Sequence, residues 1–289
     1  MKEDSHGKER RRFGRRPWGS QRPTRPSGSA HAHKAAPART DWDHVASWYD
    51  RLVGEEGSDY HRHVILPAAL RMLELSGREK LLDLCCGQGV FCRLAAPHAS
   101  AVMGVDASSQ LIQAARKYGG GDNISYVVAD ARDLGSLADG SFDAAACLMA
   151  LQDLDDLDAA LAGLAGALKS GGRAVIVIMH PCFRVPRQSS WGWDSDKKSQ
   201  FRRLDRYGSP LEIPIYTHPG SLGGQQTVFH HRPLDQMLSA LGRAGLAVVA
   251  AEELYSHHTS QPGAHSRGEN RARAEIPIFL ALKVRKNEK

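Results

Sequence analysis

The sequence contains no long hydrophobic run. No stretch of about 18 uncharged apolar residues occurs, and the first thirty residues are polar and basic without an apolar block. We therefore expect neither a membrane span nor a secretory signal, and we expect the protein to be cytoplasmic. The 289 residues are 42% hydrophobic and 24% charged, which is typical of a globular protein with a sizeable core.

Cysteine is scarce, and its spacing is not that of a disulfide framework or a zinc site. The five residues are odd in number and include no Cys-x-x-Cys pair. Most lie within apolar segments, which indicates reduced, buried thiols: Cys85, Cys86, Cys92, Cys147 and Cys182. The histidines also lack the His-x-x-x-His spacing of a helical metal site. We therefore predict that the protein holds no metal.

Positive charge is in excess only within the first forty residues. Residues 1–40 hold eleven Lys/Arg against three acids, and the whole chain has a net charge of +6, so the remainder carries −2. This segment also contains prolines and few apolar residues, so we predict a disordered tail over 1–40 and one domain over 41–289. The tail could bind RNA or an acidic surface, but a solvated extension without a partner is the favoured interpretation.

From residue 41 onward, helix-like and strand-like segments alternate. Apolar residues at helical spacing predict two helices, at about 42–52 and 60–75. Further along we predict strands at 80–86, 101–105, 124–128, 143–148 and 173–179, with helices at 90–97, 108–118 and 155–168. Strands that alternate with helices indicate βαβ units and a parallel sheet covered on both faces.

The alternation stops after residue 179. Residues 181–232 have little periodicity, which is typical of a lid or a binding insertion. A helix beginning near 234 follows, and then strand-like segments at 246–250 and 275–284 that are joined by a polar stretch at 256–273. The aromatic residues of the insertion suit an apolar or aromatic ligand: Trp191, Trp193, Tyr207 and Tyr216.

A glycine-containing turn, "LLDLCCGQGV", follows the first predicted strand. Gly87 and Gly89 allow positive φ angles and a close approach to a ligand, and the next helix presents free amides. Asp106 and Asp130 end the next two strands, where carboxylates can accept hydrogen bonds from ribose hydroxyls and an adenine amino group. Each acid alone could be only a helix cap, but together they indicate a nucleoside site.

The third glycine of a dinucleotide-binding fingerprint is missing, because Cys92 stands near the place where it is expected. A pyrophosphate would also be repelled by the carboxylate of Asp83, whereas an ammonium group would suit that acid. A ligand with adenine, ribose and an amino-acid end satisfies these observations. S-adenosylmethionine is such a ligand.

The chain resembles the class I S-adenosylmethionine-dependent methyltransferases, in particular the type 11-like group. The motifs that carry the resemblance are "LLDLCCGQGVF", "VMGVDASSQLIQAARK", "YVVADARDL", "FDAAACLMALQDLDD" and "LKSGGRAVIVIMHPCF". They stand in the family's order within about residues 40–285. The resemblance implies S-adenosyl-L-methionine as cofactor and an α/β fold. This fold is a Rossmann-like, doubly wound, mostly parallel seven-stranded sheet with an antiparallel last strand, plus an N-terminal helical segment and a lid insertion at about 181–232.

The resemblance also assigns positions to the cofactor. The implied contacts are Gly87 and Gly89 under the methionine moiety, Asp83 at its ammonium group, Asp106 at the ribose, Asp130 and Ala131 at the adenine, the Leu148 carbonyl, and Tyr49 at the cofactor carboxylate. For Tyr49, in "HVASWYDRL", packing on the sheet is an equally supported alternative.

Two departures from related subfamilies bear on the acceptor. The Asn/Asp-Pro-Pro-aromatic turn of enzymes that methylate base amino groups is absent after the fourth strand, and Gln152-Asp153 replaces the common His-His. Base N-methylation therefore loses support, and we predict a small-molecule acceptor. The alternatives are a methyltransferase of RNA or a ribosomal protein that uses the basic tail, and a non-catalytic S-adenosylmethionine-binding module.

Histidines supply the candidate catalytic groups. The sulfonium is already electrophilic, so the protein must mainly align the reactants, and a general base helps when the acceptor is a hydroxyl. His180, in "MHPCF", ends the fifth strand on the ligand side, and His61, in "SDYHRHV", precedes it in the chain. His231 and Arg232 close the insertion near the same rim. For His180, local bonding to the backbone is the alternative interpretation.

Overall fold

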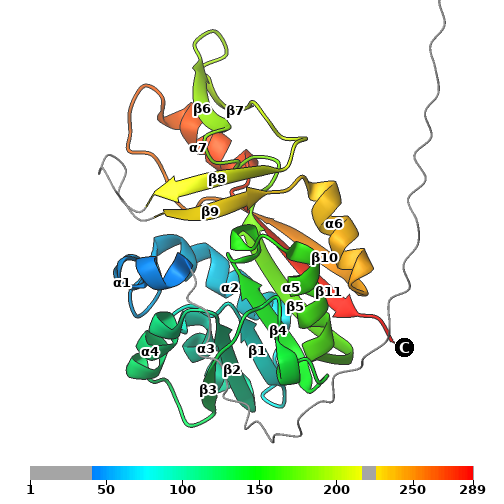
Figure 1. Cartoon of the computed structure of the whole chain (residues 1–289). Coiled ribbons are helices and arrows are strands. Elements are labelled where there is room, and N and C mark those ends of the chain that lie inside the picture. Colours follow the sequence, from blue (N-terminus) through cyan, green and yellow to red (C-terminus); the bar gives the residue numbers. More distant parts are fainter. Residues whose placement is uncertain (1–40, 217–225, 289) are drawn as a thin grey trace, which may run out of the picture. The chain divides into compact units, whose positions relative to one another are not determined.

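The computed structural model describes residues 41–216 and 226–288, so the predicted tail over 1–40 lies outside the described residues. One seven-stranded sheet organises them (Figure 1). Its strands are β1 (Lys80–Leu84), β2 (Ala101–Asp106), β3 (Ile124–Val128), β4 (Phe142–Leu148), β5 (Leu168–Met179), β10 (Leu246–Leu254) and β11 (Phe279–Lys286). Their spatial order is β10-β11-β5-β4-β1-β2-β3.

The predicted mostly parallel sheet with an antiparallel end is confirmed. Strands β3, β2, β1, β4 and β5 pair in parallel, whereas β11 is antiparallel to β5 and β10 is antiparallel to β11. The strand order reverses direction at β1, which lies between β2 and β4. Ligands of open α/β sheets bind beside this reversal, outside the carboxyl ends of the strands.

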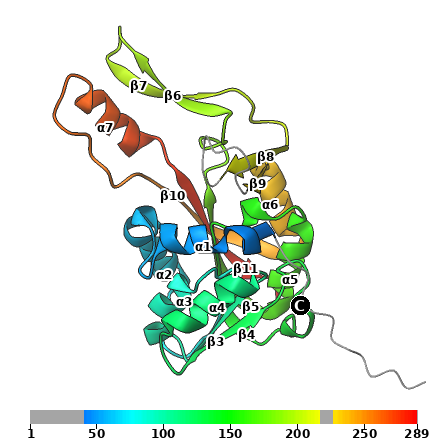
Figure 2. The ribbon, with the colours of Figure 1, turned by 60° about the vertical axis from the view of Figure 1, so that its left-hand side comes forward.

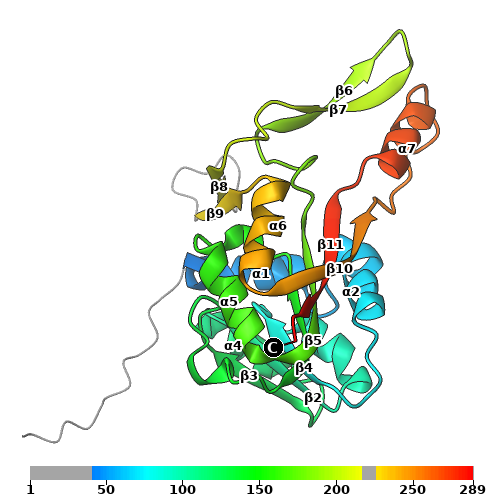
Figure 3. The same ribbon diagram turned by 90° about the vertical axis from the view of Figure 1, so that its right-hand side faces the viewer.

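Helices cover both faces of the sheet. They are α1 (Asp41–Val53), α2 (Leu66–Leu73), α3 (Val90–Ala95), α4 (Ser109–Tyr118), α5 (Leu157–Ala167) and α6 (Leu234–Arg243). Because successive strand residues point to opposite faces, Leu81 joins the core beneath α2 and α3, whereas Leu82 joins the core beneath α5 and α6. Figures 2 and 3 show the sheet between these two helical layers.

The insertion contains more regular structure than its sequence predicts. It forms two antiparallel hairpins, β6 (Ser189–Asp194) with β7 (Ser199–Leu204), and β8 (Leu211–Tyr216) with β9 (Gln226–His231). The residues of β6 are all partly buried or exposed, so neither face has the strict alternation that reveals a strand in a sequence. The polar stretch 256–273 likewise holds most of a helix, α7 (Ser266–Glu275), which packs on β7.

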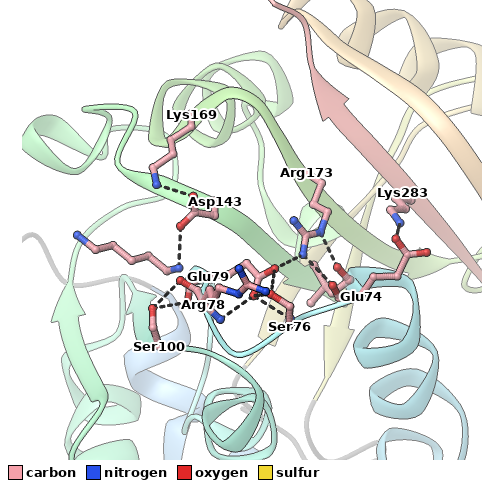
Figure 4. A network of polar contacts seen from close by, with 11 residues as sticks. Glu74, Ser76, Arg78, Glu79, Ser100, Asp143, Lys169, Arg173 and Lys283 are labelled. Atoms are coloured by element: carbon pink, nitrogen blue, oxygen red, sulfur yellow. Dashed lines mark hydrogen bonds and ion pairs between the residues drawn. The ribbon is translucent and has the colours of Figure 1, made fainter.

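Polar contacts fasten α2 to the amino ends of the strands (Figure 4). Arg173 of β5 donates to the carbonyl oxygens of Leu73 and Glu74, at 2.5 and 2.9 Å, which satisfies acceptors left free at the end of α2. The Arg173 guanidinium also donates to Glu79 Oε1 at 2.9 Å, and Ser76 N donates to Glu79 Oε2 at 2.8 Å. These bonds lie at the end of the sheet opposite the carboxyl ends of the parallel strands.

No helix among the described residues has the length and apolar character needed to cross a membrane.

We predict that Glu79→Gln destabilises the protein in a pH-dependent way. Burial alone would raise the pKa of Glu79, but the hydrogen bonds from Arg173 and Ser76 outweigh it and lower the pKa from 4.5 to about 2. A depressed pKa adds stability above pH 4.5 that is lost as the pH falls towards 2. At pH 7 the variant should therefore lose about 1–3 kcal/mol of unfolding free energy in urea titrations.

The difference between Glu79→Gln and the wild-type protein should shrink as the pH falls below about 4.5. Glu275→Gln, which changes an exposed acid at the end of α7, is the matched control and should change little. A loss that is the same at pH 3 and pH 7 would contradict the assignment.

Candidate functional site

A cavity lies at the carboxyl ends of the central strands. Its volume is about 530 Å³, which falls within the range of small-molecule sites, roughly 300–1,000 Å³. The sheet side of the cavity is lined by residues at or just after the ends of β1, β2, β3 and β4, and α1, α4 and the β8–β9 hairpin supply the rest. Of the residues predicted from the sequence to hold the cofactor, six line it: Tyr49, Gly87, Asp106, Asp130, Ala131 and Leu148.

The turn after β1 approaches the cavity closely. Cys85 and Gly87 have φ angles of 59° and 56°, in the left-handed region that glycine adopts without strain. A Cβ atom at Gly87 would lie 3.2 Å from Cε1 of Tyr49. The absence of a side chain at this position therefore lets the Tyr49 ring of α1 rest against the turn.

The second glycine of the turn does not line the cavity. A Cβ atom at Gly89, where φ is 79°, would lie 2.4 Å from Oη of Tyr126. A Cβ atom at Gly104 of β2 would likewise lie 2.7 Å from the Tyr126 ring. Gly89 is thus required by the packing of Tyr126 beneath the turn, and the structure gives it no direct place at the cavity wall.

Asp106 is the most firmly held acid of the site. Its side chain ends β2 with 8% exposure, and its Oδ2 and Oδ1 atoms accept hydrogen bonds from Gly87 N at 2.9 Å and Ser108 N at 2.8 Å. Burial raises the pKa of Asp106 to about 6, although both amide bonds favour the carboxylate. Each oxygen keeps a further lone pair, so the carboxylate can accept two hydroxyl groups of a ribose.

A buried contact holds α1 over this part of the cavity. The Ser108 hydroxyl caps α4 by accepting from Leu111 N at 3.2 Å, and it donates to Oδ1 of the buried Asp43 of α1 at 2.7 Å. Trp42 of α1 lines the cavity and packs edge-on against Tyr49, with ring centroids 5.5 Å apart. Neither Trp42 nor Asp43 was assigned a role from the sequence.

Asp130 lies in the cavity wall beside a basic partner that sequence reasoning missed. Arg132 donates to both carboxylate oxygens of Asp130, through Nε at 2.9 Å and through Nη2 at 2.6 Å, and its Nη1 donates to Asp155 at 2.5 Å. The hydrogen bonds from Arg132 lower the pKa of Asp130 below its usual value. Asp130 is therefore a carboxylate that can accept an amino group beside the amide of the buried Ala131.

Asp83 is placed beneath the turn, and it does not line the cavity. It is 2% exposed, and the Cys92 thiol donates to its Oδ2 at 3.1 Å. Burial raises the pKa of Asp83 to about 7, although the Cys92 thiol bond opposes the rise and the nearby Asp106 adds to it. Because Asp83 does not line the cavity, its position provides no direct contact with the ammonium group of a ligand bound there.

A further acid that was not assigned from the sequence does line the cavity. Asp153 follows β4 in the short turn Leu151–Asp153, and burial raises its pKa to about 8. Tyr49 lies near Asp106 and Asp153; burial, followed by these acids, raises its pKa far above the usual value, so the phenol stays protonated. Burial of so many acids near one cavity favours a cationic ligand, because positive charge stabilises their ionised forms.

The β8–β9 hairpin covers the cavity with polar side chains. Glu212 of β8 pairs with His230 of β9, and both line the cavity with Thr227 and Val228. Arg232, just after β9, donates to the carbonyl oxygens of Leu154 and Asp155 at 2.5 and 2.8 Å. This anchor fixes the end of the hairpin to the turn that follows β4.

Four aromatic residues expected to form the ligand surface lie elsewhere. Trp193 stacks on His265 with ring centroids 4.1 Å apart, and Trp191 packs under Arg202. The Tyr207 hydroxyl accepts a hydrogen bond from Leu234 N at 3.0 Å. The Tyr216 ring packs under the guanidinium of Arg187. None of the four is among the cavity-lining residues.

The two histidines predicted as catalytic groups also lie outside the cavity wall. His180 is 2% exposed, its Nδ1 accepts from Cys182 N at 3.2 Å, and its Nε2 donates to Glu253 at 3.1 Å. His61 is bonded through Nδ1 to the Ser58 hydroxyl at 2.7 Å. His231 is buried and bonds the Tyr207 carbonyl at 2.7 Å, so the histidine that faces the cavity is its neighbour His230.

Comparisons with known proteins agree with this geometry. Residues 82–176 match the family described as a methyltransferase domain. A ubiquinone biosynthesis O-methyltransferase from Xanthomonas euvesicatoria pv. vesicatoria is 28% identical over 153 residues, which are 51% of this chain and 64% of that protein. A demethylmenaquinone methyltransferase from Tropheryma whipplei is 33% identical over 155 residues, 52% of this chain and 63% of that protein. The chain thus spans under two thirds of these relatives.

A solved structure extends the similarity over nearly a whole protein. An S-adenosylmethionine-dependent methyltransferase from Mesorhizobium loti is 32% identical, with a TM-score of 0.59, and the match covers 76% of this chain and 96% of that one. The identity, the coverage and the shared fold lead to one conclusion: the chain belongs to the S-adenosylmethionine-dependent methyltransferases, and its cofactor is S-adenosylmethionine.

Proposed function

We propose that this protein transfers the methyl group of S-adenosylmethionine to a small-molecule acceptor that binds beneath the β8–β9 hairpin. The observation that carries the proposal is the position of Asp106, whose two oxygens are fixed by backbone amides at the end of β2 and still have lone pairs towards the cavity. This arrangement fits a ribose diol. The acid-rich wall fits the sulfonium and ammonium charges of the cofactor.

The other lining residues divide between the remaining parts of the cofactor. In this proposal Asp130 and Ala131 bind the adenine, and the methionine moiety is contacted by Gly87, Tyr49 and Leu148, all of which line the cavity. The protonated phenol of Tyr49 can donate a hydrogen bond to a carboxylate. Bound cofactor supplies an electrophilic methyl group; the chain's own task is to align the acceptor and exclude water.

His230 is the side chain best placed to accept a proton from the acceptor. Burial, followed by the positive charge of Arg232, lowers the pKa of His230, so the imidazole is neutral at pH 7. It lies opposite Glu212 on the neighbouring strand, and both line the cavity. A neutral imidazole beside a carboxylate suits deprotonation of a hydroxyl acceptor.

The activities for which two relatives are named support this class of acceptor. One is an O-methyltransferase of ubiquinone biosynthesis and the other methylates demethylmenaquinone, so both act on small molecules. The polar lining from the hairpin favours an acceptor that carries a hydroxyl group. Residues 41–289 carry a net charge of −2, which disfavours a nucleic acid as the substrate of this domain.

We expect Asp106→Asn to weaken S-adenosylmethionine binding by about 10- to 100-fold, because hydrogen bonds to a charged acceptor contribute about 1.5–3 kcal/mol. Isothermal titration calorimetry measures the change. The control is Asp133→Asn, an exposed acid of the loop after β3 that does not line the cavity.

The pH dependence of binding gives a second readout for Asp106. Its pKa of about 6 means that the carboxylate becomes protonated below that pH, so wild-type affinity should fall as the pH decreases from 7 to 5. Asp106→Asn should lack this particular decrease. Equal affinities for the wild-type protein and Asp106→Asn across this range would contradict the ribose-binding role.

We expect His230→Asn to lower kcat by about 10²–10⁴-fold while the dissociation constant of the cofactor is unchanged, because general-base catalysis contributes that much. The assay is transfer of labelled methyl from S-adenosylmethionine to a cell extract, with the labelled product identified by mass. His44→Asn, on the exposed side of α1, is the control.

Label in the low-molecular-weight fraction supports the proposed acceptor class, whereas label in RNA or protein would contradict it. A wild-type rate in His230→Asn would remove the base from the proposal and leave the cofactor site intact. No transfer to any fraction, with normal cofactor binding, would favour a non-catalytic binding module.

A further inference from the structure

A cluster of metal-ligating side chains lies apart from the cavity. Asp59, which precedes the π-helical turn His61–Ile65, and the adjacent His257 and His258, which follow β10, converge on one another. Nε2 of His257 lies 3.0 Å from Asp59 Oδ2, and Nε2 of His258 lies 2.9 Å from the same oxygen. All three candidate ligand atoms lie within 4.8 Å of one another.

We propose that Asp59, His257 and His258 form a binding site for a divalent transition-metal ion, with zinc as the best fit. Two imidazole nitrogens and one carboxylate oxygen are ligands that Zn²⁺ prefers, and three protein ligands leave a fourth position for water. Ligand atoms of a tetrahedral site with bonds of about 2.0 Å lie about 3.3 Å apart. The two nitrogen–oxygen distances, 3.0 and 2.9 Å, therefore need to lengthen by only a few tenths of an ångström.

Neighbouring groups hold the ligands in place, as is usual around metal sites. His63 Nδ1 lies 2.9 Å from the Asp59 carbonyl oxygen and 3.2 Å from Asp59 Oδ1, and its ring stacks on His257 with centroids 4.6 Å apart. The Tyr60 ring meets both His257 and His258 edge-on at 5.3 Å. The orientation of both imidazoles is thus set by packing from the opposite segment.

Hydrogen bonding alone gives a weaker account of this convergence. Two imidazoles would have to donate to a single carboxylate oxygen of Asp59. The side chains of Asp59 and His258 are 44% and 46% exposed. Ion pairs and hydrogen bonds at such exposed positions contribute little, because water replaces them readily and the side chains lose rotamer freedom. A metal ion replaces both weak bonds with coordination and explains why both Nε2 atoms face the same point.

The expectation of no metal rests on the absence of ligands at helical spacing, which this cluster does not use. Asp59 and His257 are separated by almost the whole domain in the sequence, so only the fold brings them together. The adjacent pair His257-His258 carries no spacing signal of its own. A site of this kind is visible only in three dimensions.

The ion would join two segments with different neighbours. The loop before Asp59 contacts the glycine turn and the helix after it, since Gln88 Nε2 donates to the Gly54 carbonyl at 2.8 Å and Arg93 of α3 donates to the Glu55 carbonyl at 2.6 Å. The segment after His258 leads to α7 (Figure 2). A bound metal ion would therefore cross-link the segment that leads from His258 to α7 with the loop that contacts the glycine turn.

Titration of the full-length chain with zinc chloride, by calorimetry after treatment with a chelator, tests the site. Residues 1–40 contain three further histidines whose imidazoles are potential zinc ligands, so the reference protein carries His6→Ala, His31→Ala and His33→Ala. We expect one zinc ion per chain, and zinc should raise the thermal unfolding midpoint of this protein. Adding His257→Ala or His258→Ala should lower the affinity by at least about tenfold and abolish the rise.

The matched control adds His98→Ala, an exposed histidine outside the cluster, and it should keep the zinc affinity of the reference protein. Circular dichroism and S-adenosylmethionine binding check that each variant is folded. Because His258 is exposed, its replacement should leave the fold intact even if His257→Ala does not. Absence of stoichiometric zinc binding, or an affinity for His258→Ala equal to that of the control, would overturn the proposal.

Discussion

The buried carboxylate of Asp106 is the group on which the arrangement of the site depends. A carboxylate removed from water must be hydrogen-bonded, and the chain supplies two amides, Gly87 N from the turn after β1 and Ser108 N from the start of α4. Ser108 in turn bonds Asp43, which brings α1 over the cavity. One acid thus orders the glycine turn, the first turn of α4 and the helix that carries Tyr49.

The part of the site that the sequence predicts is the part built by the sheet. Asp106 and Asp130 could be placed because parallel strands deliver their carboxyl ends to one edge, so residues that end strands must lie together. Asp83, near the end of β1, and Gly89, in the turn that follows, do not line the cavity. A sequence pattern identifies the turn without distinguishing a residue that faces the ligand from one that supports the turn, as Gly89 supports Tyr126.

The insertion shows where such prediction fails. Its strands pair with each other and not with the central sheet. The residues of β6 are all partly buried or exposed, so no alternation of apolar residues marks that strand, and the alternating Leu211, Ile213 and Ile215 of β8 flank Pro214, which argues against a strand in a sequence. The aromatic residues of the insertion suggest a ligand-binding surface in the sequence, but in the structure Trp193 stacks on His265, the residue before α7. The side chains that reach the cavity, such as Glu212 and His230, are inconspicuous in the sequence and are selected only by the strand register.

The contact of Tyr126 with two glycines has a consequence for how this protein can diverge. The ring on β3 extends over Gly104 of β2 to Gly89 of the cofactor turn, and it leaves no room for a Cβ atom at either glycine. At position 89 the φ angle of 79° also disfavours a side chain, whatever residue stands at position 126. A Cβ atom at position 104 would lie 2.8 Å from Sγ of Cys92 as well. A homologous chain with a larger residue at position 104 is therefore expected to carry smaller ones at both 92 and 126, so these three positions should co-vary.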